Sequence, residues 1–339
     1  MKVILVGPGS VGGTAAVLMK EAGFDISVVC VNDEVANKIS TEGYKLTGKK
    51  GDHCVKIPAF GSIDQLTEKY DICIIATKVH SMPMLAEKML PHIKDDALVV
   101  CMQNGIVTER LSAVVGEHRT VSVMIGFGAT AKSLTEVEMT STGEFYIGMP
   151  KGQTSPKLEY LRKMYDSVLP TKISTDITRE LFSKLIINSC INSTCGIAGN
   201  TLGIVLDDPR AREVFINIAT EGFYVSKAMG LKVPPYNGIL DYRFLLISKS
   251  NAYKSVLKAI FRGFGKLKYS GVKPSLLQSL ERGEKTEIDI FNGYISEKGK
   301  QYGVRTPYND LIVKLIREIE NGEREISMDN LKEFDCLAK

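Results

Sequence analysis

In the first half of the chain, short apolar runs alternate with longer segments that have a polar face. The runs are rich in β-branched residues and too short for helices, so they predict strands buried in a sheet. They fall at residues 2–6, 26–31, 71–76, 97–101, 120–127 and 144–148, with a helix at 33–41, a hairpin formed by 44–47 and 55–57, and a turn at 140–143. Strands that alternate with helices predict a mainly parallel, doubly wound α/β sheet, whose ligand crevice lies at the carboxyl ends of the strands.

The pattern changes near Asp176, beyond which long helical periodicity replaces the strand signals. Pro170 breaks the helix before this change and places the boundary at residues 169–175. A chain of 339 residues is long enough for two cores. We therefore expect a sheet domain over residues 1–172 and an all-helical domain over residues 173–339.

A G-x-G-x-x-G motif, from Gly7 to Gly12, directly follows the first strand and leads into a helical segment. In this context Gly7 permits a tight turn, Gly9 permits approach of the backbone to a pyrophosphate, and Gly12 permits close helix–strand packing. The helix N-terminus at Ser10 and Val11 presents N–H groups to the phosphates. The motif predicts a dinucleotide-binding domain, and the alternative is a purely structural glycine turn.

The residues after the second strand bear on the choice of cofactor. An acid there binds the ribose 2′-hydroxyl of NAD, whereas an arginine accommodates the 2′-phosphate of NADP. Asn32 and Asp33 occupy this position with no arginine nearby, although either residue could equally cap the next helix. Lysines at positions 45, 49, 50 and 78 could still reach a phosphate. The sequence favours NAD and leaves NADP open.

One helix predicted in the second half carries three polar residues at four-residue spacing in an apolar segment. Lys184, Asn188 and Asn192 line one face on successive turns. Buried amides and a buried ammonium need polar partners, so this face predicts the wall of a polar pocket. The alternative is a lysine that reaches solvent and asparagines that bond to the backbone.

Composition excludes several classes of protein. The net charge is +4, the seven cysteines are scattered without a C-x-x-C pair, and the four histidines lack metal-ligand spacing. We therefore expect reduced thiols, a cytoplasmic protein and no metal site. Because the first strand begins at Lys2 and no long apolar run or nucleic-acid motif follows, we expect neither a signal peptide nor membrane or nucleic-acid partners. Residues 243–280 hold many basic residues and no acid, which predicts either a solvated helix face or a surface that steers anions.

A further segment, residues 274–294, places Ser275 and Glu287 at the edges of apolar helical stretches. In isolation Ser275 is an N-cap and Glu287 a first-turn acid. Together the motifs resemble the ketopantoate reductase (2-dehydropantoate 2-reductase) family over essentially the whole chain. The resemblance rests on the glycine motif, Lys78, Gln103-Asn104-Gly105, the helix with Lys184, Asn188 and Asn192, and the stretch from Ser275 through Glu287 to Asn292-Gly293.

This resemblance implies a Rossmann-type N-terminal domain and a helical C-terminal domain of the 6-phosphogluconate dehydrogenase type. It implies NAD(P)H-dependent reduction of ketopantoate, a small-molecule 2-oxo acid, to (R)-pantoate in pantothenate and coenzyme A biosynthesis, with NADPH the usual cofactor, and it is compatible with a homodimer. By this resemblance Lys184 is the general acid, whose pKa burial would lower toward neutrality. The other implied roles are substrate binding by Asn188, Asn192 and Ser275, orientation of substrate and lysine by Glu287, and contact with nicotinamide and substrate by Asn104.

The chain departs from the family pattern at three places. Residues 31–33 lack the arginine common in members that use NADPH, residues 242–274 are longer than the family norm, and residues 193–196 are less apolar than usual. These departures leave open a different bulky substrate, such as an aryl or branched 2-oxo acid. A non-catalytic dinucleotide-binding protein on the same fold is the remaining alternative.

Overall fold

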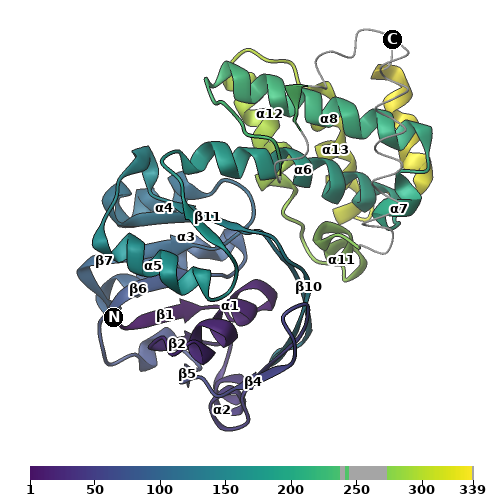
Figure 1. Ribbon diagram of the computed structural model, residues 1–339. Coiled ribbons are helices and arrows are strands. Elements are labelled where there is room, and N and C mark those ends of the chain that lie inside the picture. Colours follow the sequence, from purple (N-terminus) through teal and green to yellow (C-terminus); the bar gives the residue numbers. More distant parts are fainter. Residues whose placement is uncertain (237–240, 244–272, 338–339) are drawn as a thin grey trace. The chain divides into compact units, whose positions relative to one another are not determined.

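The computed structural model describes residues 1–236, 241–243 and 273–337, and the chain divides into two compact units, residues 1–181 and 182–339 (Figure 1). The division falls within helix α6 (Ile177–Ala198), later than the sequence pattern predicts. The reason is that strand β12 (Thr171–Ile173), which spans the expected boundary, pairs with the sheet of the first unit. Most of the basic segment at 243–273 lies outside the described residues.

The first unit is built on an eight-stranded sheet with the order β12-β11-β8-β7-β6-β1-β2-β5. Neighbouring strands are parallel except for β11, which is antiparallel to β8. Besides β12, the strands are β1 (Val3–Val6), β2 (Ile26–Val29), β5 (Ala59–Phe60), β6 (Tyr70–Ile75), β7 (Ile93–Cys101), β8 (Thr120–Met124) and β11 (Phe145–Gly148). Strand order reverses between β1 and β6, where a doubly wound sheet forms its ligand crevice. The predicted fold class is confirmed.

A second, four-stranded sheet has the order β4-β3-β10-β9. The predicted hairpin is confirmed as the antiparallel pair β3 (Tyr44–Gly48) and β4 (His53–Val55). The sequence did not predict the other two strands, β9 (Gly128–Ser133) and β10 (Glu136–Ser141), of which β10 pairs with β3 in parallel. Residues 140 and 141, expected in a turn, are therefore the end of a strand.

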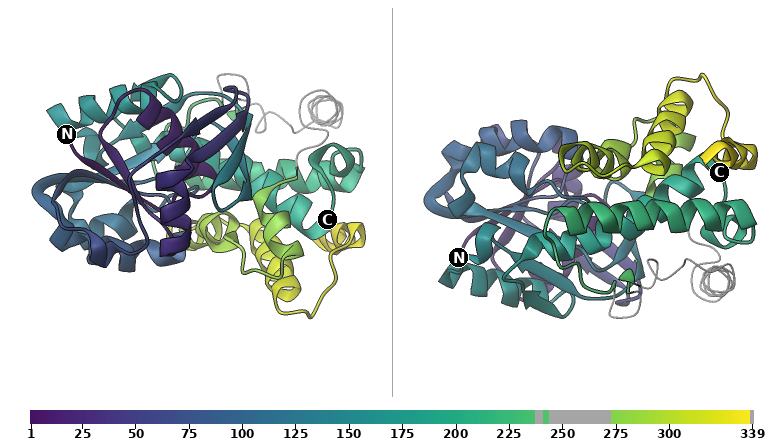
Figure 2. Two further views of the ribbon diagram at one scale, coloured as in Figure 1. Left: turned by 90° about the horizontal axis from the view of Figure 1, so that it is seen from below. Right: turned by 90° about the horizontal axis from the view of Figure 1, so that it is seen from above.

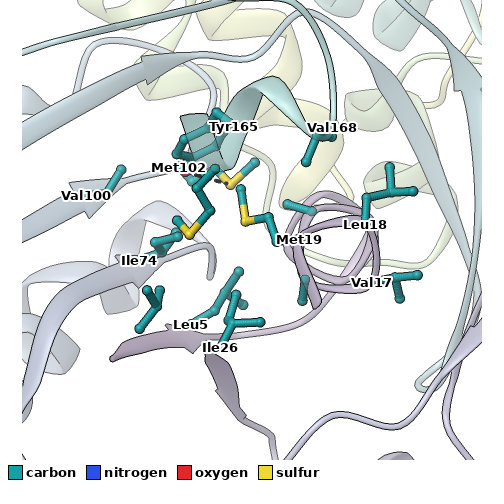
Figure 3. Close-up of a cluster of buried hydrophobic side chains, with 14 of the residues drawn as sticks. Leu5, Val17, Leu18, Met19, Ile26, Ile74, Val100, Met102, Tyr165 and Val168 are labelled. Carbon is teal, nitrogen blue, oxygen red and sulfur yellow. Dashed lines mark hydrogen bonds between the residues drawn. The ribbon is translucent and has the colours of Figure 1, made fainter. Parts of the chain in front are cut away.

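Helices cover both faces of the large sheet (Figures 1 and 2). Helices α1 (Ser10–Glu21) and α5 (Pro156–Asp166) lie on one face, and α3 (Met82–Met89) and α4 (Thr108–Val115) lie on the other. Figure 3 shows side chains of α1, α5 and the sheet packed into one buried cluster, which includes Leu5, Met19, Ile74, Met102 and Tyr165. Helix α1 also packs against β3, β9 and β10 of the second sheet. Burial between two sheets holds α1, and the glycine loop before it, in a fixed position.

The described elements of the second unit are all helical. They are the part of α6 beyond residue 181, α7 (Leu202–Val205), α8 (Pro209–Ala228), α11 (Ser275–Glu281), α12 (Asn292–Gln301), α13 (Pro307–Glu320) and two 3₁₀ segments, η6 (Ile288–Ile290) and η7 (Met328–Leu337). Gly222 of α8 lies against Ile186 of α6 and Ile295 of α12, so three helices meet closely there. Because α6 is buried on most sides, its polar residues are conspicuous. Within the described residues, no helix has the length and apolar character needed to span a membrane.

Candidate active site

The glycine loop after β1 has two packed glycines and one open glycine. Gly7 has a φ of +87°, and a Cβ there would lie 2.5 Å from Thr77 Cγ2. A Cβ at Gly12 would lie 2.5 Å from the carbonyl oxygen of Gly7. At Gly9, by contrast, a Cβ would meet no described atom within 4 Å. The two packed positions exclude side chains, and the open one leaves room for a pyrophosphate against the backbone.

The N-terminus of α1 is suited to an anion. Its N-cap, Gly9, offers no side-chain acceptor, and its first turn contains no acid. The first helical hydrogen bond runs from Gly13 N to Gly9 O at 2.7 Å, so the preceding N–H groups point out of the helix end. The Tyr44 hydroxyl donates to Pro8 O at 2.7 Å and fixes the loop. No local pattern marks Tyr44, because its partner lies 36 residues away in the sequence. These residues fit the pyrophosphate of a dinucleotide.

A cavity of about 320 Å³ opens beside the loop at the ends of β1 and β2, a volume within the range of small-molecule sites. Its wall includes Gly7 and residues 29–31 from the sheet, the turn at residues 62–64, and Leu85 and Lys88 of α3. The cavity thus lies where the adenosine part of a dinucleotide would extend from the glycine loop.

The two residues expected to contact the adenosine ribose have other partners. Asn32 is the N-cap of helix α2 (Asp33–Thr41), and its Oδ1 accepts a hydrogen bond from Val35 N at 2.9 Å. Asp33 Oδ1 accepts one from Gln65 Nε2 at 2.7 Å. Neither residue is part of the cavity wall that the structure describes. The capping explanation therefore holds for Asn32, and a cofactor contact by either residue stays a prediction.

Lys78 and Asn104 follow the carboxyl ends of β6 and β7, as the sequence predicts. Lys78 is exposed and precedes a 3₁₀ turn, whereas Asn104 is half-buried in the loop between β7 and α4. The neighbouring Gln103 is buried, and its Nε2 donates to Ile75 O at 2.8 Å. This bond fastens the Asn104 loop to the end of β6. Both residues lie at the crevice side of the sheet, and their ligand contacts stay predictions.

In the second unit, α6 presents Lys184, Asn188 and Asn192 at positions i, i+4 and i+8, and therefore on one face. Lys184 and Asn188 are half-buried, and Asn192 is 8% exposed. Burial lowers the pKa of Lys184 from its ordinary value to about 7. A lysine with this pKa can serve as a proton donor at neutral pH. The helix thus combines a titratable donor with two amides on one surface.

A buried hydrogen-bond network holds α6 in place. Asn292, the first residue of α12, donates through Nδ2 to Ser189 O of α6 at 3.2 Å and to Asn309 Oδ1 at 3.0 Å. Asn309 Nδ2 donates in turn to Glu221 of α8 at 2.7 Å. The Glu221 carboxylate also accepts from the N–H groups of Tyr308 and Asn309, although burial raises its pKa to about 7. In the sequence Asn292 stands out only as part of a motif, and no local pattern marks Glu221 or Asn309.

The segment with Ser275 and Glu287 lies in the same unit as this face. Ser275 is exposed and is the first residue of α11, whose N-cap is Pro274, so Ser275 is not a capping residue. Gly196 of α6 lies against Leu276 of α11, which places the start of α11 one turn beyond Asn192. Glu287 is half-buried and immediately precedes a 3₁₀ turn at residues 288–290. The structure therefore brings the Ser275 helix against α6, and the roles of Ser275 and Glu287 stay predictions.

All seven cysteines are free in the structure. Among the residues that the structure describes, no three His, Cys, Asp or Glu side chains gather in a way that could hold a metal ion.

Comparison with known proteins identifies the family. The protein-family model described as "Ketopantoate reductase PanE/ApbA" matches residues 3–152, and the family model "Ketopantoate reductase PanE/ApbA C terminal" matches residues 176–320. The 2-dehydropantoate 2-reductase of Aquifex aeolicus is 26% identical over 324 residues, which cover 94% of this chain and 97% of that protein. Among solved structures, the PanE/ApbA family ketopantoate reductase from Ralstonia eutropha JMP134 has a TM-score of 0.79 at 22% identity and covers 96% of this chain and 100% of its own. A D-mandelate dehydrogenase solved with NADH and anilino(oxo)acetate has a TM-score of 0.77 at 21% identity, covering 95% of this chain and 99% of its own. The chain therefore belongs to the ketopantoate reductase PanE/ApbA family of oxidoreductases.

Proposed function

We propose that this protein reduces a 2-oxo acid to the 2-hydroxy acid with a nicotinamide dinucleotide, and that the substrate is ketopantoate. The observation that carries the proposal is Lys184, whose pKa burial lowers to about 7 on a helix face shared with two amides. A general acid works best when its pKa is near the working pH. The family membership supports the choice of substrate, since the relative from Aquifex aeolicus is a 2-dehydropantoate 2-reductase.

The residues divide the work between the two units. The loop from Gly7 to Gly12 and the α1 N-terminus bind the pyrophosphate, and the dinucleotide when bound supplies the hydride. Lys184 Nζ donates a proton to the carbonyl oxygen as the carbonyl carbon accepts the hydride, which leaves a neutral amine that solvent reprotonates. Before that step the ammonium polarises the carbonyl and stabilises the charge that develops on its oxygen.

Substrate binding falls to the other polar residues of the second unit. Asn188 and Asn192 donate amide N–H groups to substrate oxygens from the same face as Lys184. The Ser275 hydroxyl, on the helix that packs against Gly196, binds the substrate carboxylate. Glu287 orients the substrate and Lys184. From the first unit, Asn104 contacts nicotinamide and substrate.

We propose NADH as the preferred cofactor. The segment after β2 carries no arginine, and Val31, two residues beyond the end of that strand, is 72% exposed and apolar. An NADP-dependent enzyme needs a cation at such a position to pair with the 2′-phosphate. The D-mandelate dehydrogenase of the same fold was solved with NADH. A homodimer also stays a prediction, which the molecular mass in solution tests.

The deciding experiment is initial-rate consumption of NADH and of NADPH with ketopantoate. Rapid turnover that falls by about a hundredfold or more in Lys184→Ala, with unchanged dinucleotide affinity, supports the proposal. Asn192→Ala should mainly raise KM. Dinucleotide binding without turnover of ketopantoate would shift the proposal to another bulky 2-oxo acid, and a panel of aryl and branched 2-oxo acids would identify it. Binding without turnover of any of them would contradict the catalytic proposal.

A further inference from the structure

A turn at residues 61–65 lies beside the end of β2. Strand β5 pairs with β2, and Cys30 N donates to Phe60 O at 2.8 Å, so the chain leaves β5 next to Cys30. A Cβ at Gly61 would lie 2.5 Å from Asp33 N. Glycine at this position therefore lets the turn close directly on the N-terminus of α2. The turn covers the site at which a Rossmann domain distinguishes its cofactors.

Asp33 is occupied in fastening this turn. Its Oδ1 accepts from Gln65 Nε2 at 2.7 Å, and Gln65 Oε1 accepts from Gly61 N at 2.8 Å. The carboxylate thus joins α2 to the turn through a single glutamine. Binding a ribose hydroxyl with the same oxygen would compete with this bond. Position in the sequence suggests Asp33 as the selective acid, whereas its bond to Gln65 and its absence from the described cavity wall give it a structural role.

Asp64, unlike Asp33, lies in the wall of the cavity at the ends of β1 and β2. It lines the cavity together with Gly7 of the dinucleotide loop and with Cys30 and Val31 after β2. Its Oδ2 accepts from the Ser62 hydroxyl at 3.0 Å, and its N–H donates to Ser62 Oγ at 3.2 Å, so the carboxylate is held at the cavity wall. A carboxylate accepts hydrogen bonds and cannot donate them, which suits a ribose hydroxyl and repels a phosphate dianion.

Lys88 is the second charged residue of the described cavity wall, and it comes from α3. One acid and one base give this wall no net positive charge, unlike an arginine-lined 2′-phosphate site. Lys88 and Asp64 are both exposed, so solvent weakens the interaction of either charge with a phosphate. The hydrogen bond that Asp64 can accept from a ribose hydroxyl is the difference between them.

We infer that Asp64 is the residue that selects NAD over NADP in this protein, and that Asp33 instead holds the turn that presents Asp64. The inference rests on the proposed function to the extent that the adenosine part of a nicotinamide dinucleotide occupies this cavity. The inference goes beyond that function because it concerns the role of one carboxylate in cofactor binding, and it can be tested without any 2-oxo acid substrate.

The test is calorimetric titration of the full-length protein with NADH and with NADPH, without a 2-oxo acid. The wild type should bind NADH more tightly. Asp64→Asn keeps the side-chain shape and an acceptor oxygen but removes the negative charge, and it should reduce the ratio of the two dissociation constants by about tenfold, which is about 1.4 kcal/mol. Asp33→Asn is the matched control, because its Oδ1 can still accept from Gln65, and its ratio should stay within about twofold of wild type.

Each other result overturns the inference in a distinct way. A ratio that changes in Asp33→Asn and not in Asp64→Asn would return selection to Asp33. Wild-type preference for NADPH that is lost in Lys88→Gln would show that the cavity binds the 2′-phosphate. In both cases dinucleotide binding, and hence the proposed reduction of a 2-oxo acid, would survive, although a preference for NADPH would overturn the proposed choice of NADH. Failure of both nucleotides to bind the wild type would overturn the proposed function and the inference together.

Discussion

Raising the pH from 6 to 9 should stop carbonyl reduction because it removes the proton from one group, the Lys184 ammonium. Burial lowers the pKa of this group to about 7, whereas an exposed lysine keeps its proton to pH 10. With that pKa the protonated fraction falls from about nine-tenths at pH 6 to about one-hundredth at pH 9. If Lys184 is the proton donor, kcat/KM for the 2-oxo acid should fall by about tenfold for each pH unit above 7.

The assay is kcat/KM at saturating dinucleotide over this pH range, with dinucleotide affinity measured at each pH. Lys184→Arg is the first control, because a guanidinium keeps its charge and any residual rate should not change with pH. Glu221→Gln is the second, because Glu221 also has a pKa of about 7 and lies in the same helical unit. A wild-type profile that stays flat to pH 9 would refute the reasoning. A profile that loses its slope in Glu221→Gln would transfer the titration to the network behind α6.

Three further outcomes follow from burial and backbone geometry. Lys184→Met should abolish turnover and raise the melting temperature. The rise in melting temperature should be larger at pH 6 than at pH 9, because the wild-type lysine is charged and desolvated below its folded pKa of about 7. The stability that the wild type has over Glu221→Gln should fall by on the order of 3 kcal/mol as pH rises from about 5 to 8, because the folded pKa of Glu221 exceeds its unfolded value. Lys184 contributes the opposite slope above pH 7 in both proteins, so the difference between their thermal melts at the two pH values isolates Glu221. Gly9→Ala should leave the melting temperature unchanged yet weaken NADH binding by about tenfold or more. Gly7→Ala, at a φ of +87°, should instead cost on the order of 2 kcal/mol of stability. Equal melting temperatures for the two variants would contradict the loop geometry.

Elements that carry their own signal were predicted closely. Strand β6 is buried along its whole length, so its apolar run is visible in the sequence without knowledge of its neighbours. Helix α2 spans residues 33–41 as predicted, since its apolar positions recur with helical period and Asn32 supplies a cap. The strand before the glycine motif and the helix after it were predicted for the same reason, because the constraints on this loop come from residues adjacent in the chain.

Elements that depend on distant partners were not predicted. Strand β9 has no buried residue and β10 is buried only at alternate positions, so neither has the apolar run of a central strand. Their place is fixed by the parallel register of Val137 with Leu46, across two segments far apart in the sequence. In the same way β12 has three residues and is a strand only because β11 lies beside it. Pairing across such distances leaves no local pattern to detect.

The same distinction separates what spacing says about the site from what it omits. Four-residue spacing predicted that Lys184, Asn188 and Asn192 share a face, and helix geometry makes that certain once α6 forms. Spacing could not choose between Asp33 and Asp64, because the choice depends on which carboxylate lines the cavity. The turn at 61–65, which is closed by tertiary contacts, places Asp64 in the cavity wall, while Gln65 binds Asp33. The Lys184 pKa is likewise a property of its surroundings rather than of its neighbours in the sequence. The sequence thus supplies the residue types of this site, and the fold decides which of them can contact a ligand. A variant that moves the turn at 61–65 should therefore alter cofactor selection even with both acids intact.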